Sequence, residues 1–146
     1  MVKKMIALVV FCSFVLLIGC SKEPIEQISE KHIEYLEQNL NLHISEPEGQ
    51  NYTVYKKIED NETVKTVLDI LLNVPWENAK VLMSRQPDYK IRTVKIDQVV
   101  SYEPATYAVW LSPNKDILEV IIEGQSRYGK VAKDDVIKIL SILETP

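Results

Sequence analysis

The chain has 146 residues, with 17 basic and 21 acidic side chains and a net charge of −4 at pH 7. A nucleic-acid partner is not expected, because proteins of that class neutralise phosphates with clustered positive charge. The length is sufficient for one domain and a connecting segment, and the sequence shows no internal repeat or low-complexity stretch.

The N-terminal segment has the order of a secretory signal. Lys3 and Lys4 precede an uncharged, mostly apolar run over residues 5–18, which is shorter than the ~20 residues that a transmembrane helix requires. The run ends at Leu17-Ile18-Gly19-Cys20. These residues resemble the lipobox of bacterial lipoproteins. An uncleaved anchor, or an ordinary signal with an unrelated cysteine, is the alternative.

The lipobox resemblance implies a location and a membrane attachment. In that family the signal, here residues 1–19, is cut between Gly19 and Cys20, and the Cys20 thiol carries a diacylglyceryl group. The protein is then expected on the extracytoplasmic face of the cell membrane, with the membrane as a partner through the lipid, since two acyl chains anchor stably. Cys12 would leave with the signal, so the mature chain would have no free thiol and no disulfide.

Residues 20–50 are expected to form an acidic spacer, with seven Glu against one Lys between residues 23 and 50. An imperfect helical stripe within it predicts a short amphipathic helix around residues 25–40. Anionic headgroups or wall polymers would repel this segment over roughly a Debye length and hold the domain off the bilayer. A linker with no role beyond reach is the alternative.

Residues 51–146 are expected to form the globular domain, beginning with a strand over 52–58. Apolar residues at three–four spacing then predict a helix over 61–73, which Asp60 or Asn61 can cap. The helix is expected to end at Val74-Pro75, because the residue before a proline avoids the α region. Trp76 follows and is expected to fold back over the helix end. A short apolar run at 81–83 is a possible strand, and alternation predicts another strand over 89–96.

The second half of the domain predicts hairpin-spaced strands over 106–111 and 117–123, a possible edge strand over 127–131, and a helix over 133–143. Asp134 and Asp135 fall in the first turn of that helix, where carboxylates favour the positive end of the dipole. The order of these strands and helices along the chain predicts an α+β fold, with an antiparallel sheet of about four to five strands and two helices packed on one face. The signal peptide and the acidic spacer precede it.

No cofactor, metal site or catalytic group is predicted. The only histidines, His32 and His43, fall within the spacer, without the clustered ligands that a metal requires. The sequence contains neither a glycine-rich phosphate loop nor a Gly-x-Ser-x-Gly elbow. Glu59-Asp60 and Asp134-Asp135 are paired carboxylates, but each pair lies at a predicted helix start, so capping accounts for them better than acid–base chemistry does.

An aromatic and basic group of residues is the candidate interaction patch. Residues 80–95 are locally basic, and aromatic residues fall in or beside the predicted strands. Aromatic and arginine side chains are enriched at binding surfaces, so the sequence predicts an exposed patch of Arg85, Tyr89, Lys90, Arg92 and Trp110. The alternative is that the aromatic residues fill the interface between sheet and helices.

From about Leu42 to its end, the chain resembles the YhfM-like domain of small lipoproteins from Bacillus-type Firmicutes. The resemblance lies in Trp76 after the first helix and in three short motifs, Pro87-Asp88-Tyr89, Tyr107-x-x-Trp110 and Tyr128-Gly129-Lys130. One departure is Ala132-Lys133, where the family has a Leu-Ser helix start. The resemblance implies the fold and the location, and it assigns no functional residue.

These features predict a lipid-anchored, non-enzymatic domain that binds an envelope protein or a wall component. One alternative is an enzyme whose site gathers scattered side chains of the domain, namely Asp88, Tyr89, Arg92 and Ser126. Another alternative is an accessory substrate-binding lipoprotein, although the folded part is short for a two-lobed cleft.

The lipobox makes a direct prediction for Cys20. The Cys20→Ala variant should lose acyl labelling and should be released from the membrane or remain as an uncleaved precursor, because the thiol is the site of lipid attachment. Metabolic labelling with a fatty acid and the mass of the mature chain measure this. Unchanged labelling and processing would contradict the lipobox, and Cys12→Ala is the matched control.

Overall fold

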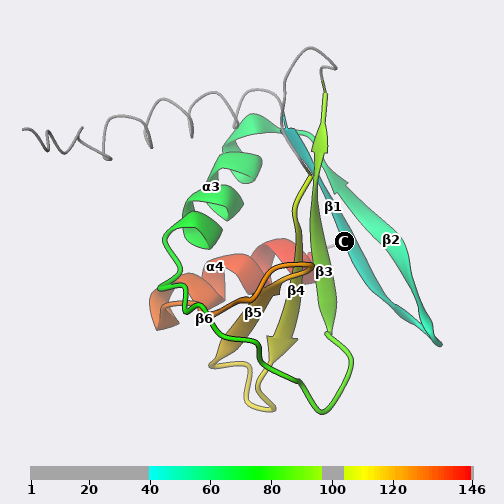
Figure 1. Ribbon diagram of the computed structural model, residues 1–146. Helices are drawn as coiled ribbons and strands as arrows, with labels where there is room; N and C mark the ends of the chain where they lie inside the picture. Colours follow the sequence, from blue (N-terminus) through cyan, green and yellow to red (C-terminus); the bar gives the residue numbers. More distant parts are fainter. Residues whose placement is uncertain (1–39, 97–103, 146) are drawn as a thin grey trace, which may run out of the picture. The chain divides into compact units, whose positions relative to one another are not determined.

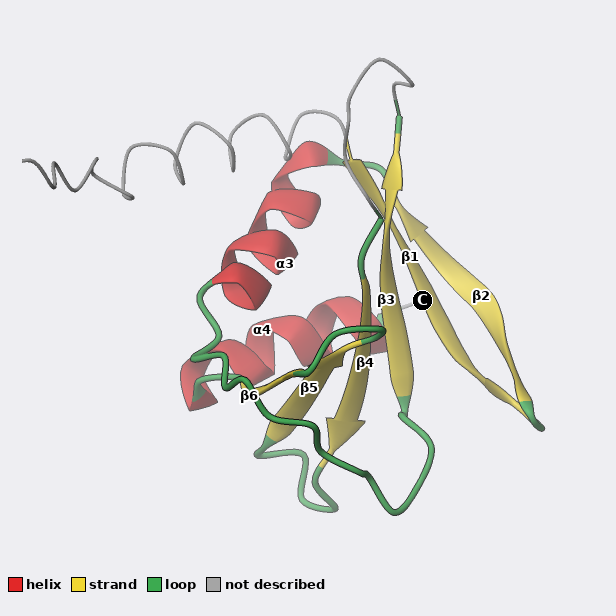
Figure 2. Ribbon diagram, in the orientation of Figure 1, coloured by secondary structure: helices red, strands yellow, loops and turns green. Residues whose placement is uncertain are grey.

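The computed structural model describes residues 40–96 and 104–145. These residues form one six-stranded antiparallel sheet, in the order β2-β1-β3-β4-β5-β6, and two helices. The helices α3 (Asn61–Leu72) and α4 (Lys133–Glu144) lie on one side of the sheet (Figures 1 and 2). The strands are β1 (Leu40–Glu48), β2 (Asn51–Ile58), β3 (Tyr89–Lys95), β4 (Thr106–Leu111), β5 (Leu118–Ile122) and β6 (Arg127–Lys130).

The predicted α+β class is confirmed, with more strands than expected. Strands predicted over 52–58, 89–96, 106–111, 117–123 and 127–131 correspond to β2 through β6. The two predicted helices correspond to α3 and α4. The signal, Cys20 and the helix predicted around 25–40 lie almost entirely outside the described residues.

The extra strand is β1, and it corrects the boundary of the spacer. Residues 40–48 were expected in the spacer, but they pair with β2 on one side and β3 on the other. Leu40, Leu42 and Ile44 are at most 1% exposed and belong to the core, and they alternate with polar residues on the other face. This period of two is that of a half-buried strand. Gly49, with φ of 64°, then makes the tight turn into β2.

The helix α3 forms as its caps and apolar spacing predict. The Asp60 side chain accepts a hydrogen bond from the Thr63 backbone N–H at 2.8 Å. The buried residues of α3 pack against the sheet in the hydrophobic core, and they are Val64, Val67, Leu68, Ile70 and Leu71. At the other end Trp76 folds back as expected, and its indole N–H donates to the Leu71 carbonyl at 3.1 Å.

The connection from α3 to β3 contains no strand at 81–83, contrary to the prediction. Leu82 is 88% exposed, so this apolar run is not core. The connection instead follows the edge of β6, where the backbones of Glu77 and Tyr128 exchange hydrogen bonds at 2.8 and 3.1 Å. At Gly129 an added Cβ would lie 2.3 Å from Val74 Cγ1, so this close approach requires glycine.

The carboxyl end of α4 is held by β2. The helix has no basic residue in its last turn, yet the Lys56 ammonium donates to the carbonyls of Ile142 and Thr145, both at 2.9 Å. The Tyr55 hydroxyl donates to the Leu143 carbonyl at 2.6 Å. A cation at this end also favours the helix dipole.

We expect Lys56→Met to lower the free energy of unfolding by about 1–2 kcal/mol, because helix carbonyls lose a charged donor. Lys57→Met is the matched control, because Lys57 is the next residue along β2 and its side chain lies on the other face of the sheet. This variant should change stability by less than about 0.5 kcal/mol. Urea denaturation measures both variants. An equal loss in the two would show that the helix contact is not responsible.

Candidate functional site

The sheet has a face covered by the helices and an open face, and the strand register assigns residues to each. Ile91 lies opposite Ile44 and Tyr107 on the helix face. Trp110 lies opposite Glu119 on the open face. Although neither α3 nor α4 covers that face, Trp110 is only 7% exposed. The connection between α3 and β3 covers the Trp110 side chain.

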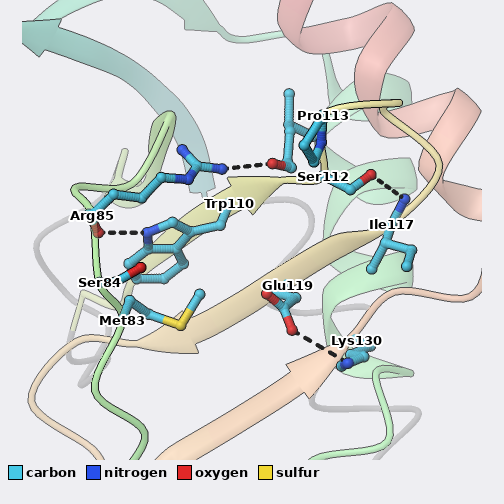
Figure 3. A pocket seen from close by; sticks show the side chains of 10 residues that line it. Met83, Ser84, Arg85, Trp110, Ser112, Pro113, Ile117, Glu119 and Lys130 are labelled. Atoms are coloured by element: carbon cyan, nitrogen blue, oxygen red, sulfur yellow. Dashed lines mark hydrogen bonds and ion pairs between the residues drawn. The ribbon is translucent and has the colours of Figure 1, made fainter.

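A pocket of about 300 Å³ lies between this connection and the hairpin that joins β4 to β5 (Figure 3). Its apolar lining comes from Met83, Trp110, Pro113 and Ile117, and its charged lining from Arg85, Glu119 and Lys130. In Figure 3 the Trp110 indole lies beside Met83 and Ser84, and Glu119 lies between this indole and Lys130. The volume is at the lower end of the ~300–1,000 Å³ typical of small-molecule sites.

The Trp110 wall of the pocket is fixed by a polar clamp. The indole N–H donates to the Arg85 carbonyl at 3.0 Å. The Arg85 guanidinium donates to Asp88 Oδ1 at 2.6 Å and to the Leu111 carbonyl at 2.5 Å. Asp88 Oδ2 in turn accepts the Leu111 N–H at 2.7 Å. Three of these hydrogen bonds hold the connection against β4, and the fourth, from Arg85 to Asp88, lies within the connection and fixes the two side chains that reach Leu111.

The charge on Asp88 follows from this clamp. Partial burial by itself would raise the pKa of the Asp88 carboxyl, but the hydrogen bonds from Arg85 and from the Leu111 N–H outweigh it and lower that pKa. The ionised form, which accepts both bonds, is therefore the one that the fold stabilises.

Glu119, the neighbour of Trp110 on β5, is held by two partners. The Tyr128 hydroxyl donates to Glu119 Oε1 at 2.5 Å, and the Lys130 ammonium lies 3.3 Å from the same oxygen. The Tyr128 hydrogen bond is the largest cause that lowers the pKa of Glu119, with Lys130 adding to it against the effect of burial. Glu119 is thus an ionised, internally paired carboxylate.

The hairpin wall is built by Ser112. Its hydroxyl oxygen accepts the backbone N–H groups of Asp116 and Ile117, both at 3.1 Å, and donates to the Asp116 carboxylate at 2.6 Å. This turn leaves the Ile117 side chain 44% exposed at the pocket. Ile117 is therefore the exposed apolar side chain of this pocket that an apolar group of a ligand can contact.

The structure does not gather the five predicted patch residues. Arg85 and Trp110 line the pocket. Tyr89 lies on the helix face, 6.2 Å from the Tyr55 ring between centroids. Lys90 lies on the open face, where its ammonium is 2.7 Å from Glu123 Oε1 and 4.3 Å from the Tyr52 ring centroid.

The fifth patch residue, Arg92, is exposed on the open face opposite His43, one row away from Lys90. His43 itself was expected in the spacer, but it belongs to β1 inside the folded domain. The predicted exposed aromatic patch is therefore wrong for Trp110, which is buried.

The scattered residues of the enzyme alternative are also separated. Tyr89 and Arg92 point to opposite faces of the sheet, as positions three apart on a strand do. Asp88 is taken up by the clamp, and Ser126 lies in the turn that precedes β6. Among residues 40–96 and 104–145, no group of three His, Cys, Asp or Glu side chains is placed to hold a metal.

Sequence reasoning missed Met83, Ile117, Glu119 and Lys130 as pocket residues. Ile117 was assigned to a strand and Met83 to a possible one, because both belong to apolar runs. The only local signal was the Ser112-Pro113-Asn114 turn, which places the next residues at the ends of two paired strands.

Comparison of the chain with family models, with curated proteins and with solved structures found no match in any of the three. None of the helices in the described ranges is both long and apolar enough to cross a membrane.

The clamp predicts a pH dependence that Asp88→Asn should remove. Because the folded-state pKa is lowered, the stabilisation is complete above the unfolded pKa of ~4 and is lost as the pH falls through the folded value. We expect the variant to be about 1 kcal/mol less stable at neutral pH, with the difference narrowing in acid. Urea midpoints across this pH range measure it. The exposed Glu77→Gln is the control, and a difference that stays constant with pH would contradict the role of the charge.

Proposed function

We propose that this protein is a lipid-anchored, extracytoplasmic binding protein without catalytic activity. The support for the anchor is Leu17-Ile18-Gly19-Cys20 after an uncharged run of signal length. A protein held at the membrane by lipid needs no membrane-binding surface on its domain. The domain's own surface is then free to recognise another molecule of the envelope.

The proposed ligand of the pocket is an apolar side chain of an envelope protein. The observation that carries this is the pairing of the charged groups around the pocket. Arg85 is satisfied by Asp88 and Leu111, and Glu119 by Tyr128 and Lys130. The part of the lining that is left to contact a ligand is therefore apolar, and it includes Ile117, which is 44% exposed. Interface hot spots occur where an anchor side chain fills such a pre-formed pocket.

The pocket favours a protein over an anionic wall polymer. Lys130 and Arg85 each face a carboxylate, so a polyanion that contacts them also meets the negative charge of Glu119 or Asp88. The repulsion from these carboxylates offsets the attraction of a polyanion to the two cations. An apolar side chain meets no such repulsion.

Site-specific photo-cross-linking tests this proposal in native membranes. A benzophenone amino acid replaces Ile117, and the matched control replaces Ile137, which is 73% exposed on α4. We expect one envelope protein, identified by mass spectrometry, to cross-link from position 117 and not from 137. Met83→Glu in the same chain should abolish the cross-link, because it places a charge in the apolar lining.

Several outcomes would contradict the proposal. A cross-link that survives Met83→Glu, or one that forms equally from position 137, would show that the pocket is not the contact. An adduct of wall polymer at position 117 would replace the protein partner with a wall component.

A further inference from the structure

Three strands bring basic side chains together on the open face, away from the pocket. His43 on β1 lies directly opposite Lys57 on β2 and Arg92 on β3. Residues in such positions have Cβ atoms about 4.5–5.5 Å apart and share a face. Leu42 and Ile44, which flank His43, are both 0% exposed in the core, so the His43 row points to the other side.

The row formed by Lys57, His43 and Arg92 carries positive charge that no acidic side chain of the row balances. Directly opposed like charges destabilise a sheet, and Lys90 in the next row has Glu123 at 2.7 Å. Among the ion pairs of residues 40–96 and 104–145, neither Lys57 nor Arg92 takes part. The sheet thus places one cation on each side of His43, and within the described part of the chain neither cation forms an ion pair.

We infer that His43, Lys57 and Arg92 form a binding site for a phosphate group. The guanidinium of Arg92 can donate two parallel hydrogen bonds to phosphate oxygens, and the Lys57 ammonium adds a point charge. A protonated His43 imidazole between them donates a third contact. Each donor comes from a different strand, so the register of β2, β1 and β3 sets their spacing.

The site is sensitive to pH through His43. Burial first, and then Lys57 and Arg92, lower the pKa of the His43 imidazole, while Glu59 just beyond β2 opposes them. A bound anion favours the protonated imidazole, so binding raises that pKa and strengthens as the pH falls. The neighbours of His43 along β1 on this face are uncharged, and they are Asn41 and Ser45.

NMR titration of the histidines in the full chain, held in non-ionic maltoside micelles, tests the inference. The titration is run in inorganic phosphate and in sodium chloride of equal ionic strength, because screening alone would also relieve repulsion from the two cations. We expect phosphate to raise the His43 pKa by about one unit relative to chloride. The His32 pKa, as an internal reference, should be equal in both salts.

Four variants separate a site from a general effect. In chloride, Lys57→Gln and Arg92→Gln should each raise the His43 pKa, since each removes a repelling charge. In the double variant Lys57→Gln/Arg92→Gln, the His43 pKa should be no higher in phosphate than in chloride. Lys90→Gln, which removes a side chain that is paired with Glu123, should keep the full phosphate effect. An equal shift in phosphate and chloride, or a phosphate shift that survives in the double variant, would overturn the inference.

Two further arms identify the source of the phosphate. Polyphosphate and vesicles of phosphatidylglycerol are each added in place of inorganic phosphate, with phosphatidylcholine vesicles as the control. A His43 shift with phosphatidylglycerol alone assigns the bilayer surface, and one with polyphosphate alone assigns a soluble polymer. This site shares no residue with the Ile117 pocket, so either can fail while the other stands.

Discussion

The position of β1 between β2 and β3 is the constraint on which the rest of the structure depends. Leu40, Leu42 and Ile44 supply buried side chains at the centre of the core, and both neighbouring strands pair with this one strand. Without β1, the strand β2 would have no place in the sheet, and the contacts of Lys56 with the end of α4 would be lost. The same register presents His43 between two cations on the open face.

A second constraint is the cover that the α3–β3 connection provides over β4. The hydrogen bond from Trp110 to the Arg85 carbonyl and the bonds of Arg85 and Asp88 with the Leu111 backbone hold this segment in place. The aromatic ring that the sequence marked as a candidate for binding is thereby used to fix the connection. What is left for recognition is the space beside it, next to Ile117. The clamp thus connects the stability of the domain to the shape of its pocket.

From residue 51 onward, nearly all elements of the fold were predictable because their signals are local. The caps of α3, the proline that follows it and the alternation in β5 act over a few residues. The strand β1 was missed because Leu40 also fits the helical stripe that precedes it, and because Pro47 and two glutamates make the segment appear to be a linker. Its partners lie far away in the sequence, so pairing could not correct the assignment.

For the described residues, the sequence by itself determined the α+β class, both helices and five of the six strands, because hydrophobic period and capping depend on near neighbours. Only the tertiary structure decided which face each side chain occupies and what covers it. Trp110 is buried by a residue 25 positions earlier in the chain, and His43 meets Arg92 through strand pairing. Such contacts depend on register between distant segments, and a shift of one residue would move every side chain to the other face.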